Sequence, residues 1–375
     1  MVLDVQPHGL PDRRTIHRTE KRKCYITNNT NIFLKSYKMN TQNENKKTNS
    51  LMMISAVLLL IVTLLSVAVN MKAQERVEML PFGDFESWTV RYIKESSLIG
   101  GKTRALYMVA PTDTVYGTEY KRSSSPWSTG NAYAKAFGVN KVSVSVTPER
   151  HNDGYCAKLE SKLEVVNALG IDLKALATGS LYTGVLCEPM TLAHSKDPGS
   201  AIDMGVPFTG RPKALMLDYK AKIDPMGQIV YADAGTKVKN VDGHDCGQIV
   251  LILQYRWEQD GHVYAYRVGT ATEYITESTN GWQDGHRVEV CYGTPATDCT
   301  KPWQQLSNDR FKTHNSQGEM VCVEETGWRP DLAPTHMIIQ ISAGCQKPFT
   351  GCPGNTVWVD NIGLVYDDAA LAQGK

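Results

Sequence analysis

Short stretches in which apolar and polar residues alternate dominate the chain after residue 76, and long amphipathic helices are missing. In residues 141–146, KVSVSV, the valines at 142, 144 and 146 recur every second residue, which is the period of a half-buried strand. Comparable runs, rich in β-branched and aromatic residues, occupy 213–223, 248–257, 263–268, 287–292 and 337–342. Many short strands without intervening helices predict an all-β, antiparallel sandwich or barrel rather than a nucleotide-binding α/β fold.

The chain organisation after residue 76 is that of one large domain over residues 77–367. No linker rich in Pro, Ser or Gly and no fixed-period repeat divides this region. Asp260 and Gly261 stand between two strand-like runs, which predicts a hairpin over residues 248–268. Residues 293–334 are polar and turn-rich, and we expect a surface excursion there, with Cys299 and Cys322 as a staple.

The N-terminal region is predicted to carry an export segment. Residues 51–69 are uncharged and almost wholly apolar, and Lys46 and Lys47 precede them, so 51–73 is predicted to be a signal peptide or an uncleaved N-terminal anchor. Cleavage after Ala68 or Ala73 would start the mature protein near residue 69 or 74. Residues 1–50 are expected to be a lead outside the fold, with Met39 as the expected true start.

Charge and cysteine content limit the partners and the compartment. A formal charge of +1 gives no electrostatic bias toward nucleic acid, so no nucleic-acid partner is expected, and a membrane partner only through an uncleaved N-terminal segment. Eight of the nine cysteines follow the apolar run, an even number that suits disulfides in an exported protein. Cys345 with Cys352, and Cys291 with Cys299, are predicted to close short loops; buried free thiols are the alternative.

Compact catalytic signatures are missing from the sequence. There is no G-x-S-x-G, H-E-x-x-H, Walker loop, G-x-G-x-x-G or EF-hand loop, which disfavours serine hydrolases, zinc proteases and nucleotide-dependent enzymes. Glycosidases need only two carboxylates about 5 to 9.5 Å apart. The members considered for such a pair are Asp153, Glu160, Asp218, Asp242, Asp245 and Glu258. A solvated or structural role is the alternative for each.

Tryptophan and tyrosine are the side chains that point most directly to a ligand class. Seven tryptophans and seventeen tyrosines offer ring faces that can stack on sugars while nearby amides and carboxylates bond to hydroxyls. Trp257 and Trp358 lie inside strand-like runs and are predicted to be core. The candidates for exposed carbohydrate-binding platforms are Trp127, Trp282, Trp303 and Trp328, which lie in segments rich in Ser, Gly, Asn or Pro.

Several segments together resemble one family. They are FGDFESW (82–88), SSPWSTGN (124–131), GYCAKLESK (154–162), LATGSLYTG (176–184), GVPFTGRPKALMLDYK (205–220) and VWVDNIGLVY (357–366). In order and spread they resemble PCMD, the putative carbohydrate metabolism domain of exported Bacteroidetes proteins. The resemblance implies a jelly-roll-like β-sandwich and a role near glycans, and it supplies no reaction.

The first and last of these segments are also similar to those of galactose-binding-like modules, whose terminal strands meet and often hold a structural calcium. Carboxylates suit that ion, and the matching side chains would be Glu86 and Asp360; two polar residues at a strand seam are the alternative. We therefore expect 81–88 and 357–366 to pair as strands. A local irregularity at residues 360–361 would put Val357, Val359 and Ile362 on the inner face and Trp358 with Asp360 on the other.

Three functional hypotheses follow. The first is an exported, non-catalytic glycan-binding or accessory domain in the periplasm or at the cell surface, with a glycan or polysaccharide as partner. The second is a glycoside hydrolase or related carbohydrate-active enzyme. The third is a structural or adhesion protein that recognises other outer-surface proteins. Opposed carboxylates in a pocket would favour the enzyme, aromatic residues beside a shallow groove the binder, and a flat apolar patch the adhesin.

Overall fold

The computed structural model describes residues 34–36, 38–40, 52–53, 75–119, 121, 123–136, 138–168, 170–295 and 302–367. Internal contacts divide the chain into two units, Met1–Ala73 and Gln74–Lys375. The export segment predicted at 51–73 lies outside the described residues except for Met52 and Met53. Among the residues that are described, no helix is both long and apolar enough to cross a membrane.

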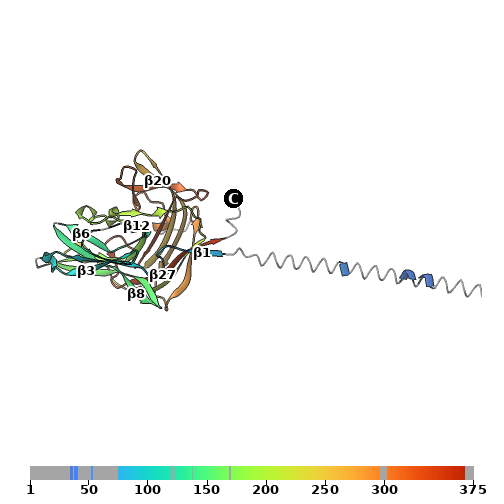
Figure 1. Ribbon diagram of the computed structural model, residues 1–375, viewed down its shortest axis with the longest axis horizontal. Coiled ribbons are helices and arrows are strands. Elements are labelled where there is room, and N and C mark those ends of the chain that lie inside the picture. The colour runs from blue at the N-terminus through green and yellow to red at the C-terminus, as the bar shows by residue number, and fades with distance from the viewer. Residues whose placement is uncertain are drawn as a thin grey trace, which may run out of the picture. The chain divides into compact units, whose positions relative to one another are not determined.

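The second unit is an all-β sandwich, which confirms the predicted fold class (Figure 1). One sheet has the order β21-β15-β27-β9-β8, with β1 added to β27. Its strands are β1 (Glu75–Met79), β8 (Val146–His151), β9 (Gly154–Glu160), β15 (Ala214–Lys222), β21 (Gln283–Glu289) and β27 (Thr356–Asp367). Every pairing within it is antiparallel.

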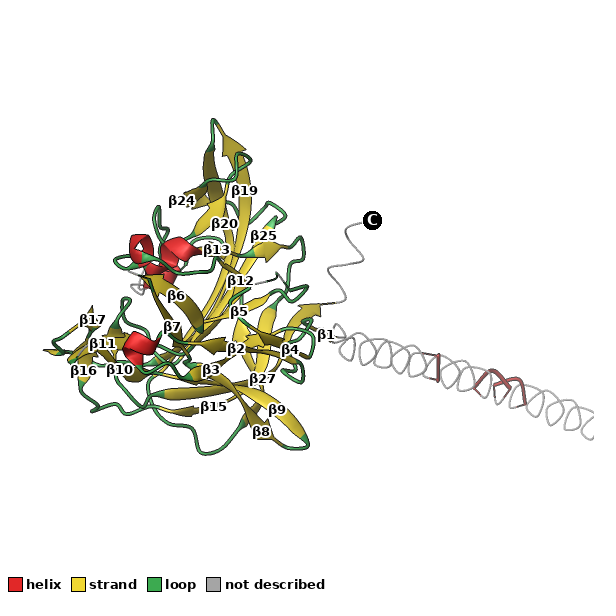
Figure 2. Cartoon of the chain, turned by 60° about the vertical axis from the view of Figure 1, so that its left-hand side comes forward, coloured by secondary structure: helices red, strands yellow, loops and turns green. Residues whose placement is uncertain are grey.

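The facing sheet is larger and follows the order β13-β12-β25-β19-β20-β24-β23, with β5, β14 and β22 attached to it. Its strands are β5 (Trp127–Thr129), β12 (Ser180–Leu186), β13 (Ile202–Met204), β14 (Val206–Pro207), β19 (Gly247–Gln259), β20 (His262–Ile275), β22 (Cys291–Tyr292), β23 (Lys312–His314), β24 (Met320–Trp328) and β25 (His336–Ser342). Figure 2 shows β19, β20 and β24 at one end of this unit and β8 and β9 at the other.

Smaller sheets and single helical turns surround this pair. The sheets are β3 (Thr103–Val109) with β2 (Trp88–Lys94) and β4 (Asp113–Tyr116); β6 (Ala132–Ala136) with β7 (Val139–Ser143); β10 (Lys162–Ala168) with β11 (Ile171–Ala177) and β17 (Asp233–Gly235); and β18 (Lys239–Val241) with β16 (Ile229–Tyr231) and β26 (Thr350–Gly351). The 3-10 turns are η1 (Ser97–Ile99), η2 (Leu192–His194), η3 (Pro198–Ala201) and η4 (Pro302–Gln304).

The main core lies between the two large sheets and is built from alternating positions. On β15, Leu215 and Leu217 are fully buried, and on β19 the residues Ile249, Leu251 and Leu253 are fully buried on the facing side. The hairpin predicted at 248–268 is confirmed, because β19 and β20 pair as far as Gln259 opposite His262. Asp260 and Gly261 form its turn with φ values of 53° and 80°, which suits an Asp-Gly pair.

The predicted strand pairing of 81–88 with the last strand is wrong in detail. The strand that pairs with β27 is β1, just before that stretch, whereas 81–84 form a turn and Trp88 begins β2 of a different sheet. The φ values of Phe82 and Phe85, 59° and 49°, prevent an extended strand here. The stretch still lies beside β27, because the Gly83 carbonyl accepts a 2.9 Å hydrogen bond from the Ile362 N–H.

The irregularity predicted in the last strand is present. Asn361 has a φ of 50°, and β15 pairs Met216 with Gly363 but Asp218 with Asp360, so one extra residue bulges from β27. The inner face therefore changes phase, and Val357, Val359 and Ile362 are all fully buried in the core as predicted. Trp358 and Asp360 lie on the other face.

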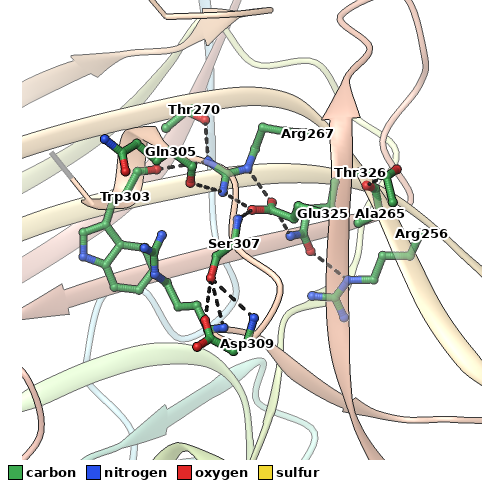
Figure 3. Close-up of polar contacts among 12 residues, drawn as sticks. Arg256, Ala265, Arg267, Thr270, Trp303, Gln305, Ser307, Asp309, Glu325 and Thr326 are labelled. Atoms are coloured by element: carbon green, nitrogen blue, oxygen red, sulfur yellow. Dashed lines mark hydrogen bonds and ion pairs between the residues drawn. The ribbon is translucent and has the colours of Figure 1, made fainter. Parts of the chain in front are cut away.

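The predicted surface excursion at 293–334 is largely integrated into the fold. Its residues include the hairpin β23–β24, and β24 pairs in parallel with β20. Phe311 and Val323 are fully buried in a second core cluster. Within the segment, Glu325 of β24 accepts hydrogen bonds from Arg267 of β20 and from the Ser307 backbone (Figure 3). The staple predicted for Cys299 and Cys322 falls outside the described residues, because Cys299 is not described.

The cysteine pairing predicted for Cys345 and Cys352 is also wrong. Cys345 forms a disulfide with Cys246, 99 residues away, with a Cα–Cα distance of 5.4 Å. The reason is sheet geometry: β19 and β25 pair Gln248 with Ser342, so the residues just outside this pair meet across the ladder. Cys352 is a buried thiol nearby whose pKa is raised by burial. The Cys291–Cys299 pairing stays a prediction, since Cys299 is not described.

Candidate functional site

One surface of the smaller main sheet gathers aromatic and ionisable side chains. We call it the Trp282 face and define it by His151, Lys220, Trp282, Trp358 and Asp360. It follows from the strand alternation, because the core takes every second residue of β15 and β27 and leaves the others outside. The register then pairs Lys220 with Trp358 across these two strands.

Trp282 covers a buried contact between a histidine and a carboxyl group at one end of this face. It belongs to the loop between β20 and β21, and its ring stacks on the His151 ring with centroids 3.7 Å apart and planes inclined by 17°. His151 Nδ1 lies 2.7 Å from Asp360 Oδ2, and both side chains are only 8% exposed. Trp282 itself is half-buried. The histidine and its carboxylate thus fix the orientation of a surface indole.

Lys220 connects the two tryptophans of the face. Its Nζ lies 4.3 Å from the centroid of the Trp358 ring and 5.5 Å from that of Trp282, which are cation–π distances. The Trp358 Nε1 donates a 2.8 Å hydrogen bond to Glu149 Oε1. The face therefore consists of two indole rings, each fixed by side-chain contacts, with the ammonium group of Lys220 between them.

The carboxylates beside these rings are already engaged. Burial raises the pKa of Asp360, and the neighbouring Asp218 adds to the rise, while the hydrogen bond from His151 opposes it. Asp218 Oδ1 accepts from the Gly285 N–H, and its Oδ2 accepts from Asn361 Nδ2 at 2.8 Å. Asp360 Oδ1 accepts from the Asn361 N–H at 2.8 Å. Each of the four carboxylate oxygens thus has a protein partner.

The four predicted platforms have different fates. Trp127 is 4% exposed and lies in the main core, where its Nε1 donates to the Pro81 carbonyl at 2.9 Å, so its predicted exposure is wrong. Trp303 packs against the second core cluster and donates to Gln248 Oε1 at 3.0 Å. Trp328 is half-buried, with Arg267 Cζ 5.4 Å from its ring centroid. Trp282 alone of the four lies on the outer face.

The two tryptophans predicted to be core are half-buried at the surface instead. Trp358 belongs to the Trp282 face. Trp257 belongs to a cross-strand stack on β19 and β20, which we call the Trp257 ladder and define by Tyr255, Trp257, Tyr264 and Tyr266. Ring centroids in the ladder lie 5.6 Å apart for Trp257 and Tyr264 and 4.7 Å apart for Trp257 and Tyr266. These positions continue the core face of β19 toward the tip of its hairpin, which explains why the strand pattern looked buried.

The other predicted carboxylates do not assemble into a site. Asp245 is 3% exposed, and its side chain accepts from the backbone N–H groups of Cys345 and Cys352. Glu258 accepts from Ser316. Asp153 and Asp242 are exposed, and Glu160 lies at the end of β9 with Lys158 as its ion partner.

The predicted calcium ligands, Glu86 and Asp360, are not part of a cluster of metal-ligating side chains among the described residues. In the described part of the chain, no group of three or more His, Cys, Asp or Glu side chains is placed to hold a metal ion. Glu86 accepts from the Tyr155 N–H at 3.0 Å, while Asp360 contacts His151. The calcium site at Glu86 and Asp360 stays a prediction.

Sequence reasoning missed His151 and Lys220, because their importance depends on partners far away in the chain.

The fold and this surface define a class: an all-β sandwich with half-buried tryptophans and ionisable groups on the outer face of one sheet. More particularly, the chain belongs to the family described as "Putative carbohydrate metabolism domain", PCMD, whose model matches residues 84–365. The resemblance stated from the sequence is thereby confirmed, and it associates the chain with carbohydrate.

Comparison with solved structures also finds similar proteins. A crystal structure described as a putative glycoside hydrolase from Bacteroides vulgatus is 16% identical in sequence, with a TM-score of 0.35. The match covers 77% of this chain and 94% of the other. A search of curated proteins finds no match.

Proposed function

We propose that this protein is an exported, non-catalytic glycan-binding domain and that the Trp282 face is its binding surface. The observation that carries the proposal is the arrangement of Trp282 and Trp358 on one sheet face with Lys220 between them. Aromatic faces stack on the C–H faces of sugar rings, and ammonium groups and carboxylates bond to hydroxyls. Membership of a carbohydrate-associated family supports the ligand class.

The choice of this face over the Trp257 ladder depends on what each ring already contacts. In the ladder, ring faces stack on one another across the hairpin, which is the ordinary way in which cross-strand aromatic pairs stabilise two strands. On the Trp282 face, both indoles contact ionisable groups, whereas Trp257 of the ladder contacts tyrosine rings, and ionisable groups contribute little to hydrophobic stability. We therefore assign the ladder to hairpin stability and the Trp282 face to recognition.

A hydrolase is less well supported. Asp218 and Asp360 are neighbours across two strands, and a carboxyl whose pKa is raised, as that of Asp360 is, suits a general acid. However, all four oxygens of this pair accept hydrogen bonds from the protein, and Asp360 is 6% exposed. The pair is thus better suited to fixing the surface than to attacking a substrate.

Export is part of the proposal. The Cys246–Cys345 disulfide suits the periplasm or the cell surface, where thiols are oxidised. The apolar segment predicted at 51–73 would deliver the chain there.

The test is a glycan array probed with the exported protein, followed by titration calorimetry on a positive glycan. We expect at least one glycan to bind and Trp282→Ala to lose about 2 kcal/mol, or roughly thirtyfold in affinity. Trp257→Ala is the matched control, because it removes a half-buried indole from the ladder, and it should bind as the parent does.

Two outcomes would contradict the proposal. Binding that survives Trp282→Ala but is lost in Trp257→Ala would move the site to the ladder. Release of reducing ends from a bound glycan, abolished by Asp218→Asn, would replace the binding function with hydrolysis.

A further inference from the structure

A large apolar cavity lies apart from the Trp282 face. Its volume is about 690 Å³, within the range of small-molecule sites. Two β-hairpins, β6–β7 and β10–β11, contribute its walls, β12 contributes Ser180 and Tyr182, and the turns η2 and η3 contribute Leu192 and Pro198. None of the residues that define the Trp282 face lines it.

The β6–β7 hairpin has two apolar faces with different partners. On one face Tyr133 and Val142 pack into a small core cluster with Ile93 and Leu106. The alternate residues Ala132, Ala134 and Val139 line the cavity, together with the polar Lys141 and Ser143 of the same face. This face therefore has side chains suited to burial and an open volume in front of it.

The β10–β11 hairpin shows the same asymmetry. Val166, Leu173 and Ala175 line the cavity. Val165, the neighbour on the opposite side of β10, is 53% exposed. Alternation thus directs one apolar row of this hairpin into the cavity and leaves Val165 of the other row in solvent, while Leu176 near the end of β11 is buried and also lines the cavity.

The lining contains few charged side chains, and carboxylates outnumber lysine and arginine among them. Lys141 Nζ lies 3.3 Å from Glu164 Oε2 and 3.2 Å from Glu95 Oε1, so the cation is neutralised by two carboxylates. Glu164 Oε1 also accepts from Ser143 Oγ and the Val144 N–H. Asp233 adds a further carboxylate to the lining. Among the described residues of the lining, no lysine or arginine is left unpaired for an anionic head group.

The lining favours an aliphatic chain over a sugar or a flat ring. Of the described residues that line the cavity, only Tyr182 and Phe349 carry aromatic rings other than histidine, whereas Ala and Val occur on both hairpins and Leu on β10–β11. Aliphatic walls contact a flexible chain by dispersion without demanding a ring orientation. An apolar volume of this size would lose those contacts if it stayed empty.

We propose that this cavity binds the aliphatic chain of an uncharged single-chain amphiphile. The chain lies between the two hairpins, and the polar head remains in solvent. The site is independent of the proposed glycan surface, so the two proposals can fail separately.

The probes are octyl, decyl and dodecyl ethers of tetraethylene glycol, titrated below their micelle-forming concentrations by calorimetry. They carry no sugar, so binding does not depend on the Trp282 face. Because each buried methylene contributes about 0.8 kcal/mol, we expect each two-carbon extension to tighten binding roughly fifteenfold. Tetraethylene glycol alone should not bind.

Variants locate the binding. Ala175→Phe fills the cavity and should abolish the chain-length dependence, while Val165→Phe adds the same ring on the solvent side of the same hairpin and should preserve it. Ala134→Phe fills the cavity from the facing hairpin and replaces Ala175→Phe if circular dichroism shows that the latter does not fold.

Three results would overturn the proposal. The first is the absence of binding by every ether. The second is decanoate binding as tightly as the decyl ether, which would contradict the uncharged head group. The third is a dimer in sedimentation that Ala175→Phe dissociates, which would show that a second copy covers the cavity.

Discussion

Glu325 lies at the centre of the most deeply buried ion pair described here, and its replacement by glutamine is expected to destabilise the protein strongly. The side chains of Arg267 and Glu325 are both 0% exposed. Oε1 of Glu325 accepts from Arg267 Nε at 2.6 Å and from Gln254 Nε2 at 2.7 Å, and Oε2 accepts from Arg267 and from the Ser307 N–H (Figure 3).

Glu325→Gln keeps the shape and removes the charge. The guanidinium of Arg267 then remains buried without a counter-charge. In addition, the glutamine Nε2 replaces one carboxylate oxygen, so a hydrogen-bond donor faces the N–H donors that this oxygen had accepted from. Removing one partner of a buried pair costs about 3–5 kcal/mol. Because whole domains are stable by about 5–15 kcal/mol, urea unfolding of Glu325→Gln should show a large fall in the midpoint.

Asp331→Asn is the matched control. Asp331 makes a two-bond contact with Arg329, at 2.8 and 2.6 Å, but these side chains are 59% and 46% exposed. Water and salt screen such a pair, so the same chemical change should have only a small effect. If Glu325→Gln unfolds no more easily than Asp331→Asn, the description of a dry, structural ion pair is refuted. Replacing Arg267 by Met and Glu325 by Leu together should restore most of the stability.

Two further predictions concern the disulfide and the pH dependence of stability. Replacing Cys246 and Cys345 together by serine should cost up to about 4.7 kcal/mol in unfolding experiments, because the bridge closes a loop of about 100 residues; an unchanged stability would show that the bridge does not form. Burial, with Arg256 nearby, lowers the pKa of His336 from 6.5 to about 4. The unfolded chain therefore takes up a proton that the folded one does not, so stability present above pH 6.5 should be lost as the pH falls toward 4, and His336→Gln should flatten that slope in urea midpoints.

The strands were predictable because alternation is local. Val357, Val359 and Ile362 were assigned to the core correctly, including the change of phase at the bulge, since a run of twelve residues in β27 contains the pattern. The same locality explains the errors over 81–88. The residue pattern does not predict that Phe82 and Phe85 adopt positive φ values, because these depend on packing against β27.

Long-range contacts account for what the sequence could not show. Cys345 has Cys352 seven residues away, yet sheet register gives it Cys246 at a separation of 99. The polar segment around Glu325 looked solvent-exposed because its buried partner, Arg267, lies 58 residues earlier. Trp127 and Trp282 have similar polar neighbours in the sequence. Trp127 nevertheless packs in the core and Trp282 lies at the surface, and only the tertiary fold distinguishes them.

The most direct test of glycan recognition on the Trp282 face is hydroxyl-radical footprinting of the protein with and without a glycan that binds on the array. Mass spectrometry reports the oxidation of each tryptophan separately. We expect the glycan to protect Trp282 and Trp358 and to leave Trp257 unchanged. Protection of Trp257 with no change at Trp282 and Trp358 would contradict this expectation.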